Sequence, residues 1–124
     1  MTSVLVIDDN DRNRKLAVEV LSASGFRTFG SATAAQGIAL AREHVPDVIL
    51  MDLRLPDIDG VEATRQLAAH ERTASIPVVA MSASPLEGSE DWLEEAGFAG
   101  WLEKPIQVST FPDQVRRYRA PRPG

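Results

Sequence analysis

The sequence feature that most limits the possible folds is an apolar run, Val48 to Met51, that ends on the carboxylate of Asp52. Val48 and Ile49 are β-branched, and a short uninterrupted apolar run of this kind is typical of a strand buried on both faces of a parallel sheet. Open α/β sheets bind their ligands beyond the carboxyl ends of such strands. Asp52 is therefore the first candidate for chemistry.

Four more strand-like segments alternate with segments of helical periodicity, and one of them, residues 27–29, is short and partly polar, as suits the edge of a sheet. The expected strands cover residues 4–7, 27–29, 47–52, 76–81 and 100–103, each followed by a helix, and these helices end near residues 24, 43, 68, 96 and 118. The expected caps are Asn10 or Asp11 for the first helix, Ser31 or Thr33 for the second, and Thr110 paired with Asp113 for the last. The positions expected to face the sheet are Leu16, Val20 and Leu21, then Ala34, Ala35, Ile38 and Ala41, then Val61, Leu67 and Ala68, then Leu86, Leu93 and Ala96, and finally Phe111, Val115 and Tyr118.

Alternation of strands with helices predicts a doubly wound α/β domain, because parallel strands need crossover connections and these are right-handed. Periodicity alone does not give the order of the strands. If the first and third strands are neighbours, as in the flavodoxin-like order 2-1-3-4-5, the carboxylates of Asp8, Asp9 and Asp52 meet at the switch point of the five-stranded sheet.

Length and composition exclude several classes of protein. A chain of 124 residues suits one domain, expected over residues 1–119 with a basic tail at 120–124. The absence of cysteine rules out disulfides and thiolate chemistry, and the net charge of −5 argues against binding nucleic acid. No apolar run is long enough to cross a membrane and no signal peptide is evident, so the expected location is the cytoplasm.

Three carboxylates held close together repel one another unless a cation is bound. Mg²⁺ suits such a set, because it prefers oxygen ligands and binds through a few carboxylates together with phosphate oxygens. A carboxylate beside Mg²⁺ can act as the nucleophile toward a phosphoryl group. Lys104, which follows the last strand, and Ser82, which follows the fourth, offer an ammonium and a hydroxyl to the same group.

These features occur in segments that together resemble the receiver domain of response regulators over essentially the whole chain. The matching segments are Val4 to Asn10, Ile49 to Gly60, Pro77 to Ala83, and Lys104 with Pro105. Each segment is weak evidence by itself, whereas all four in this order and spacing are highly specific.

The resemblance implies a role for each residue of the set. Asp52 is the expected phosphorylation site, and Asp8, Asp9, Asp52 and the backbone carbonyl of Arg54 are the expected ligands of Mg²⁺. Lys104 and Ser82 are expected to contact the phosphoryl group, Ser82 and Trp101 to form the switch, and the Lys104–Pro105 peptide bond to be cis.

The function predicted is that of a stand-alone response regulator in a two-component phosphorelay, a phosphoacceptor and not an enzyme. The expected partners are a sensor histidine kinase or phosphotransfer protein and a downstream protein, with self-association through the face from the fourth to the fifth helix as a further output. An excised piece of a hybrid kinase is another possible origin.

Two alternatives come from other functional classes. A pseudo-receiver would keep the fold and bind partners without phosphorylation. An aspartate-nucleophile phosphatase usually needs a second acid two residues after the nucleophile, and Arg54 stands at that position. His44 and His70 have no partner in the motif set and are expected at the solvated surface.

Overall fold

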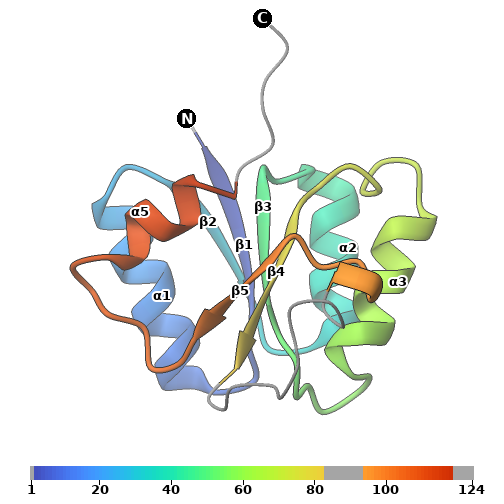
Figure 1. The fold of residues 1–124 in the computed structure, drawn as a ribbon, viewed down its shortest axis with the longest axis horizontal. Coiled ribbons are helices and arrows are strands. Elements are labelled where there is room, and N and C mark those ends of the chain that lie inside the picture. The colour runs from blue at the N-terminus through green and yellow to red at the C-terminus, as the bar shows by residue number, and fades with distance from the viewer. Residues whose placement is uncertain (1, 83–93, 119–124) are drawn as a thin grey trace, which may run out of the picture.

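A computed structural model describes residues 2–82 and 94–118 of the chain as a sheet between two layers of helices (Figure 1). The sheet has five parallel strands in the order β2-β1-β3-β4-β5. They are β1 (Ser3–Ile7), β2 (Arg27–Ser31), β3 (Val48–Asp52), β4 (Val78–Ser82) and β5 (Gly100–Glu103). The predicted fold class and strand order are therefore confirmed.

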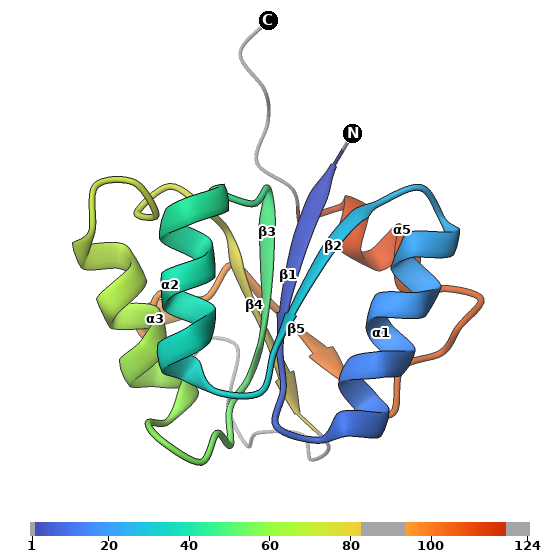
Figure 2. The same cartoon turned by 180° about the vertical axis from the view of Figure 1, so that it is seen from behind.

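The described helices cover both faces of the sheet (Figure 2). Helices α1 (Asp11–Ala23) and α5 (Phe111–Arg116) lie on one face, and α2 (Ala34–His44) and α3 (Gly60–Ala69) lie on the other. The predicted helix at 85–96 and the tail at 120–124 fall mostly or wholly outside the described residues. Within the described part of the chain, no helix has both the length and the apolar content needed to cross a membrane.

The central strands explain why the sheet is the core of the molecule. Every residue of β3 is buried, and so are the last four residues of β1. Because successive side chains of a strand point to opposite faces, Ile49 and Met51 join the core under α2 and α3, whereas Val48 and Leu50 join the core under α1 and α5. The unbroken apolar runs of the sequence thus contribute side chains to both hydrophobic cores, one on each face of the sheet.

The inward faces of three helices differ in part from the prediction. Leu16, Ala35 and Ala68 are exposed, and their places in the cores are taken mainly by small residues. The buried residues of these helices are Ala17 and Leu21 in α1, Ala34, Gly37, Ile38 and Ala41 in α2, and Gly60, Ala63, Thr64 and Leu67 in α3. Small residues let each helix approach the sheet closely: a Cβ on Gly37 would collide with the side chain of Ile7.

The predicted helix ends are largely confirmed. Asn10 caps α1 by accepting a hydrogen bond from the Asn13 amide, and Thr33 does the same for α2. Gly25, just after α1, has a φ of 92° that favours glycine. The capping pair predicted at Thr110 is wrong: the Thr110 amide and hydroxyl both bond the carbonyl of Gln107, so Thr110 ends the preceding turn and makes no side-chain cap.

His44 is exposed, as predicted, but it also makes a contact that the sequence did not indicate. Its ring stacks on Phe29 of the edge strand β2, with 4.3 Å between the ring centroids. The side chain of His44 is 32% exposed, so one ring face is covered. The periodicity of α2 could not indicate this contact because the two residues belong to different elements.

Val45 is the most strained described residue of the backbone. It follows α2 with a φ of 45°, a left-handed conformation in which its branched Cβ crowds the carbonyl oxygen. Its amide closes the helix by donating to the Ala41 carbonyl at 2.9 Å. The side chain is 40% exposed, so few contacts offset the strain.

We expect Val45→Gly to raise the free energy of unfolding by about 1 kcal/mol, because glycine adopts the left-handed conformation without steric cost. Urea denaturation of the two proteins measures the change. Val45→Ala is the matched control: it also removes the exposed apolar atoms but keeps a Cβ, so it should recover less than half of the gain. A glycine variant that unfolds at the same or lower urea concentration than wild type would contradict the strain argument.

Candidate functional site

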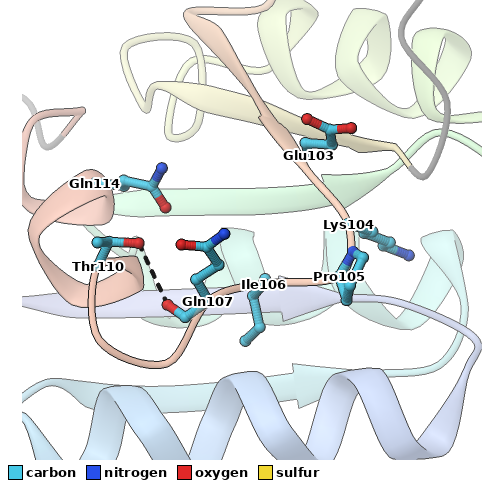
Figure 3. Close-up of a pocket in the computed structure, with 7 residues that line it drawn as sticks. All are labelled: Glu103, Lys104, Pro105, Ile106, Gln107, Thr110 and Gln114. Atoms are coloured by element: carbon cyan, nitrogen blue, oxygen red, sulfur yellow. Dashed lines mark hydrogen bonds between the residues drawn. The ribbon is translucent and has the colours of Figure 1, made fainter.

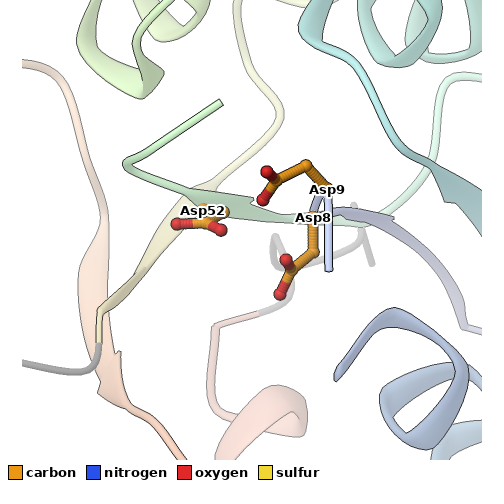
Figure 4. A group of neighbouring side chains, drawn as sticks. All are labelled: Asp8, Asp9 and Asp52. Carbon is orange, nitrogen blue, oxygen red and sulfur yellow. The ribbon is translucent and has the colours of Figure 1, made fainter. Parts of the chain in front are cut away.

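The site lies at the carboxyl edge of the sheet, where β1 and β3 are neighbours. The register pairs Ile7 with Met51, so the residues that follow, Asp8 and Asp52, emerge side by side. One oxygen from each of Asp8, Asp9 and Asp52 lies within 4.8 Å of the others (Figure 4). Asp8 and Asp52 are 1% and 8% exposed, whereas Asp9 is open to solvent. The predicted convergence of the three carboxylates is therefore found.

Lys104 places its ammonium between the two buried carboxylates. Its Nζ lies 2.7 Å from Asp8 Oδ2 and 3.0 Å from Asp52 Oδ2, and only 11% of its side chain is exposed. The backbone positions it: the Lys104 amide donates to the Ser82 carbonyl at 2.8 Å as β5 ends beside β4. The Lys104–Pro105 peptide bond is cis.

The buried charges shift one another's protonation. Burial raises the pKa of Asp8, and the contacts with Lys104 and the Asn10 amide offset this only in part. Burial by itself would lower the pKa of Lys104, but the contacts with Asp8 and Asp52 outweigh it and raise that pKa. Lys104 is therefore held as a cation against the two acids.

Backbone amides orient two of the carboxylates, and an arginine holds the backbone of Asp8. The Asn10 amide donates to Asp8 Oδ1 at 2.9 Å, and the Arg54 amide donates to Asp52 Oδ1 at 3.0 Å. Arg14 Nη1 donates to the backbone carbonyl of Asp8 at 2.8 Å, while its Nη2 bonds Asp11. Arg14 was not among the residues singled out from the sequence.

A cleft of about 320 Å³ opens onto the carboxylates. Its lining contains the predicted residues Asp9, Asp52, Arg54, Ser82 and Lys104, together with Asn10, Asn13 and Leu53. The residues chosen from four separate segments of the sequence thus share one hollow.

Trp101, the predicted switch aromatic, lies in β5 opposite Ala80 and packs on the core under α2 and α3. It does not line the cleft. Its indole N–H is buried and has no hydrogen-bond partner among the described residues.

A second hollow of about 410 Å³ lies between the end of β5 and α5 (Figure 3). Its lining residues are Glu103, Lys104, Pro105, Ile106, Gln107, Thr110 and Gln114. Lys104 turns its ammonium away toward Asp8 and Asp52, which leaves Glu103 as the charged group of this lining. Because the hollow gathers no set of ligating or nucleophilic groups, the chemistry belongs to the acidic cleft.

The loop that follows Asp52 contains two contacts that were not predicted from the sequence. Asp57 accepts hydrogen bonds from the amides of Ala34 at 3.0 Å and Ala35 at 2.9 Å, at the start of α2. Gly60, the first residue of α3, lies against the end of β3, where an added Cβ would come within 2.8 Å of the Asp52 carbonyl oxygen. In the sequence, Leu55 to Gly60 was noted as part of the Ile49 to Gly60 segment that resembles receiver domains, without these contacts.

The contacts of Asp57 make stability depend on pH. The amides of Ala34 and Ala35 hold the pKa of the Asp57 carboxyl below its ordinary value of 3.8. A group with a pKa lowered by folding binds fewer protons in the folded state. Its contribution to stability is therefore present above the unfolded pKa and is lost as the pH falls through the folded pKa.

We expect Asp57→Asn to lower the free energy of unfolding by a constant amount at neutral pH. The difference in unfolding free energy from wild type should shrink once the pH falls below 3.8, the ordinary pKa of this carboxyl. It should disappear at a pH where Asp57 is protonated in both the folded and the unfolded wild type. Urea denaturation of both proteins across this pH range measures it. A difference that stays constant down to the lowest pH would show that the carboxylate charge is not involved.

The donor set fits a hard divalent cation. Three carboxylates contribute oxygen ligands only, and Asp9 faces the open cleft, where a partly hydrated ion can enter. The cluster contains neither sulfur nor imidazole ligands, which softer metals prefer. Mg²⁺ is the ion that this chemistry favours.

The fold is that of a doubly wound α/β domain with an acidic cleft and a lysine at the carboxyl edge of its sheet, and the sequence matches the response regulator receiver domain family over residues 4–116. The chain belongs to that family. The polar-differentiation response regulator DivK of Brucella ovis is 37% identical over 116 residues, which cover 94% of this chain and 94% of DivK.

Two solved structures support the comparison. The receiver domain of the sensor histidine kinase PA1611 from Pseudomonas aeruginosa PAO1 is 31% identical and has a TM-score of 0.84, with 94% of this chain and 96% of that chain covered. Its active-site cleft holds a coordinated magnesium ion. The chemotaxis protein CheY4 of Vibrio cholerae is 23% identical and has a TM-score of 0.89, with 95% of this chain and 98% of that chain covered. At this identity the likeness is evidence for the fold alone.

Proposed function

We propose that the Asp52 carboxylate accepts a phosphoryl group from a histidine kinase or phosphotransfer protein. The observation that carries the proposal is the position of the Lys104 ammonium, 2.7 Å from Asp8 and 3.0 Å from Asp52, at the floor of a cleft onto which Asp9 also opens. Two buried carboxylates that hold an ammonium between them, beside a cleft open to solvent, form a site that suits a phosphoryl group.

Each residue has a part in this transfer. An oxygen of Asp52 forms the new O–P bond while the P–N bond of the donor phosphohistidine breaks and its electron pair returns to the imidazole. The Arg54 amide and Lys104 hold the Asp52 carboxylate in one orientation, and Lys104 is placed to contact the phosphoryl oxygens. Asp8, Asp9, Asp52 and the Arg54 carbonyl would hold Mg²⁺, which neutralises the charge that develops on those oxygens.

The response is proposed to pass through Ser82 and Trp101 to a protein partner. Ser82 lines the cleft at the end of β4, and Trp101 lies one strand away with an indole N–H that has no hydrogen-bond partner within residues 2–82 and 94–118. A hydrogen bond from Ser82 to the phosphoryl group would shift β4 relative to β5 and α5. The downstream contact, self-association included, would use the face that runs to α5, and the compartment proposed for this exchange is the cytoplasm.

The full set of acidic residues and Lys104 favours this function over a pseudo-receiver, which has no need of a cation held between two buried acids. The phosphatase alternative has no support, because Arg54 stands where the general acid is required and its amide already bonds Asp52.

Intact mass after incubation with Mg²⁺ and acetyl phosphate tests the proposal. The expected result is one phosphoryl-sized adduct that requires Mg²⁺ and is removed by alkali, as an acyl phosphate is. Absence of the adduct with acetyl phosphate and with a phosphorylated histidine donor, while Mg²⁺ still binds, would exclude the phosphoacceptor function.

A further inference from the structure

The β3–α3 loop, residues 53–59, connects Asp52 to α3 and contains Arg54, so its position determines the shape of the cleft. Its ends are held beside the sheet: the Leu53 amide bonds the Met81 carbonyl of β4 at 3.4 Å, the Arg54 amide bonds Asp52, and the Gly60 amide bonds the Leu53 carbonyl at 3.1 Å. In the described part of the chain, the hydrogen bonds from the middle of this loop to another element are those that Asp57 accepts from α2.

The start of α2 is a rigid anchor for that loop. Thr33 caps α2 through the Gln36 amide, which leaves the amides of Ala34 and Ala35 for an outside acceptor. The carboxylate of Asp57 takes one amide on each oxygen, at 3.0 and 2.9 Å. A negative group at this end is also favoured by the helix dipole.

The start of α2 is also connected to the acidic cluster through β1. Helix α2 packs on β1, where Gly37 lies directly against the side chain of Ile7. Ile7 is followed by Asp8, and the Asp8 amide bonds the Ser31 carbonyl at 3.0 Å, just before α2. Asp57 therefore ties the loop that follows Asp52 to the helix that supports Asp8.

We propose that Asp57 is a positioning residue for the cleft: by joining the β3–α3 loop to the start of α2, it fixes the Arg54 backbone before the cation and phosphoryl group arrive. The proposal deepens the proposed function and rests on it for the phosphoryl step. The Arg54 amide orients Asp52, and the Arg54 carbonyl is the expected fourth ligand, so a shift of this loop alters both. Small displacements of this kind reduce rates strongly even when the fold persists.

Asp59 provides a matched control in the same loop. It accepts a hydrogen bond from the Glu62 amide at 2.8 Å and caps α3, so its bonds to described residues stay within its own helix. Asp59→Asn removes the same charge as Asp57→Asn, and asparagine remains a good N-cap. Comparison of the two variants separates the link to α2 from the general loss of one negative charge.

The test measures Mg²⁺ affinity by NMR titration and phosphoryl uptake from acetyl phosphate. Asp57→Asn is expected to weaken both by about fivefold and to shift the amide resonance of Arg54, whereas Asp59→Asn should change them by less than about twofold. Ala35→Pro removes one donor amide within the first helical turn, where proline is tolerated, and should weaken Mg²⁺ binding in the same direction. The double variant Asp57→Asn with Ala35→Pro should bind Mg²⁺ at most about twofold more weakly than Asp57→Asn alone, because both changes break the same link between the loop and α2.

Wild-type Mg²⁺ affinity in Asp57→Asn, or equal losses in Asp57→Asn and Asp59→Asn, would overturn the inference. These outcomes are separate from failure of the proposed function. If the wild type takes up no phosphoryl group, the Mg²⁺ titration still compares the two variants.

Discussion

Asp52→Asn is expected to abolish phosphoryl uptake completely while leaving the fold intact. The variant removes the nucleophilic carboxylate but keeps a side chain of the same size, which can still accept the Arg54 amide bond. Asp8 remains paired with Lys104 at 2.7 Å, and one of two neighbouring buried carboxylates is gone, so electrostatic repulsion falls. Intact mass with Mg²⁺ and acetyl phosphate measures uptake, and urea denaturation measures stability.

Asp59→Asn is the control for that experiment because it removes an exposed carboxylate outside the cleft lining. It should be phosphorylated as wild type is. Uptake at the wild-type rate by Asp52→Asn would place the acceptor elsewhere, and unfolding of Asp52→Asn at much lower urea would mean that the loss of uptake is structural.

Lys104→Ala should have the second largest effect, and the effect should depend on Mg²⁺. Without the ammonium, Asp8 and Asp52 remain buried without a cation, so the metal-free protein should lose about 3 kcal/mol of unfolding free energy. Saturating Mg²⁺ should restore part of this loss, because the ion binds the folded state and no longer competes with the lysine. Any phosphoryl group that is taken up should no longer change the fluorescence of the protein, since the proposed contact of Lys104 with the phosphoryl oxygens is lost and the group is no longer held in place for the response.

Lys15→Ala is the matched control, because Lys15 is exposed on α1 and its removal also deletes one positive charge. Urea denaturation with and without Mg²⁺ should leave this variant close to wild type. A Lys104→Ala protein that is as stable as wild type without Mg²⁺, or that is not stabilised more than wild type by Mg²⁺, would contradict the role of the ammonium between the two acids.

The sequence predicted the elements that depend on local pattern. The bounds of β5 agree to the residue, and the acids that end β1 and β3 were identified as neighbours once the strand order was assumed. Local apolar runs and turn residues were sufficient for this, because a buried parallel strand and the polar residue that ends it lie next to each other in the chain.

What the sequence did not predict depends on contacts between elements. Asp57 has the composition of an ordinary turn residue, and its bond to Ala34 spans 23 positions. Leu16 was assigned to the inward face by helical periodicity, which does not show how closely the helix approaches the sheet. The same pattern does not indicate that the Arg14 side chain reaches back to the end of β1. Thr110 was assigned by a cap motif, but the preceding turn had already taken up its amide and hydroxyl.

The single lysine among three acids has a consequence for how long a signal can last. Asp8, Asp9, Asp52 and Lys104 together carry a net charge of about −2 when all are ionised, which one divalent cation balances. Phosphorylation replaces the single charge of the Asp52 carboxylate with the nearly two charges of an acyl phosphate, so it adds about one further negative charge. Without the bound ion, the phosphorylated site therefore carries a large uncompensated negative charge. The lifetime of the signal should follow the free Mg²⁺ concentration of its surroundings.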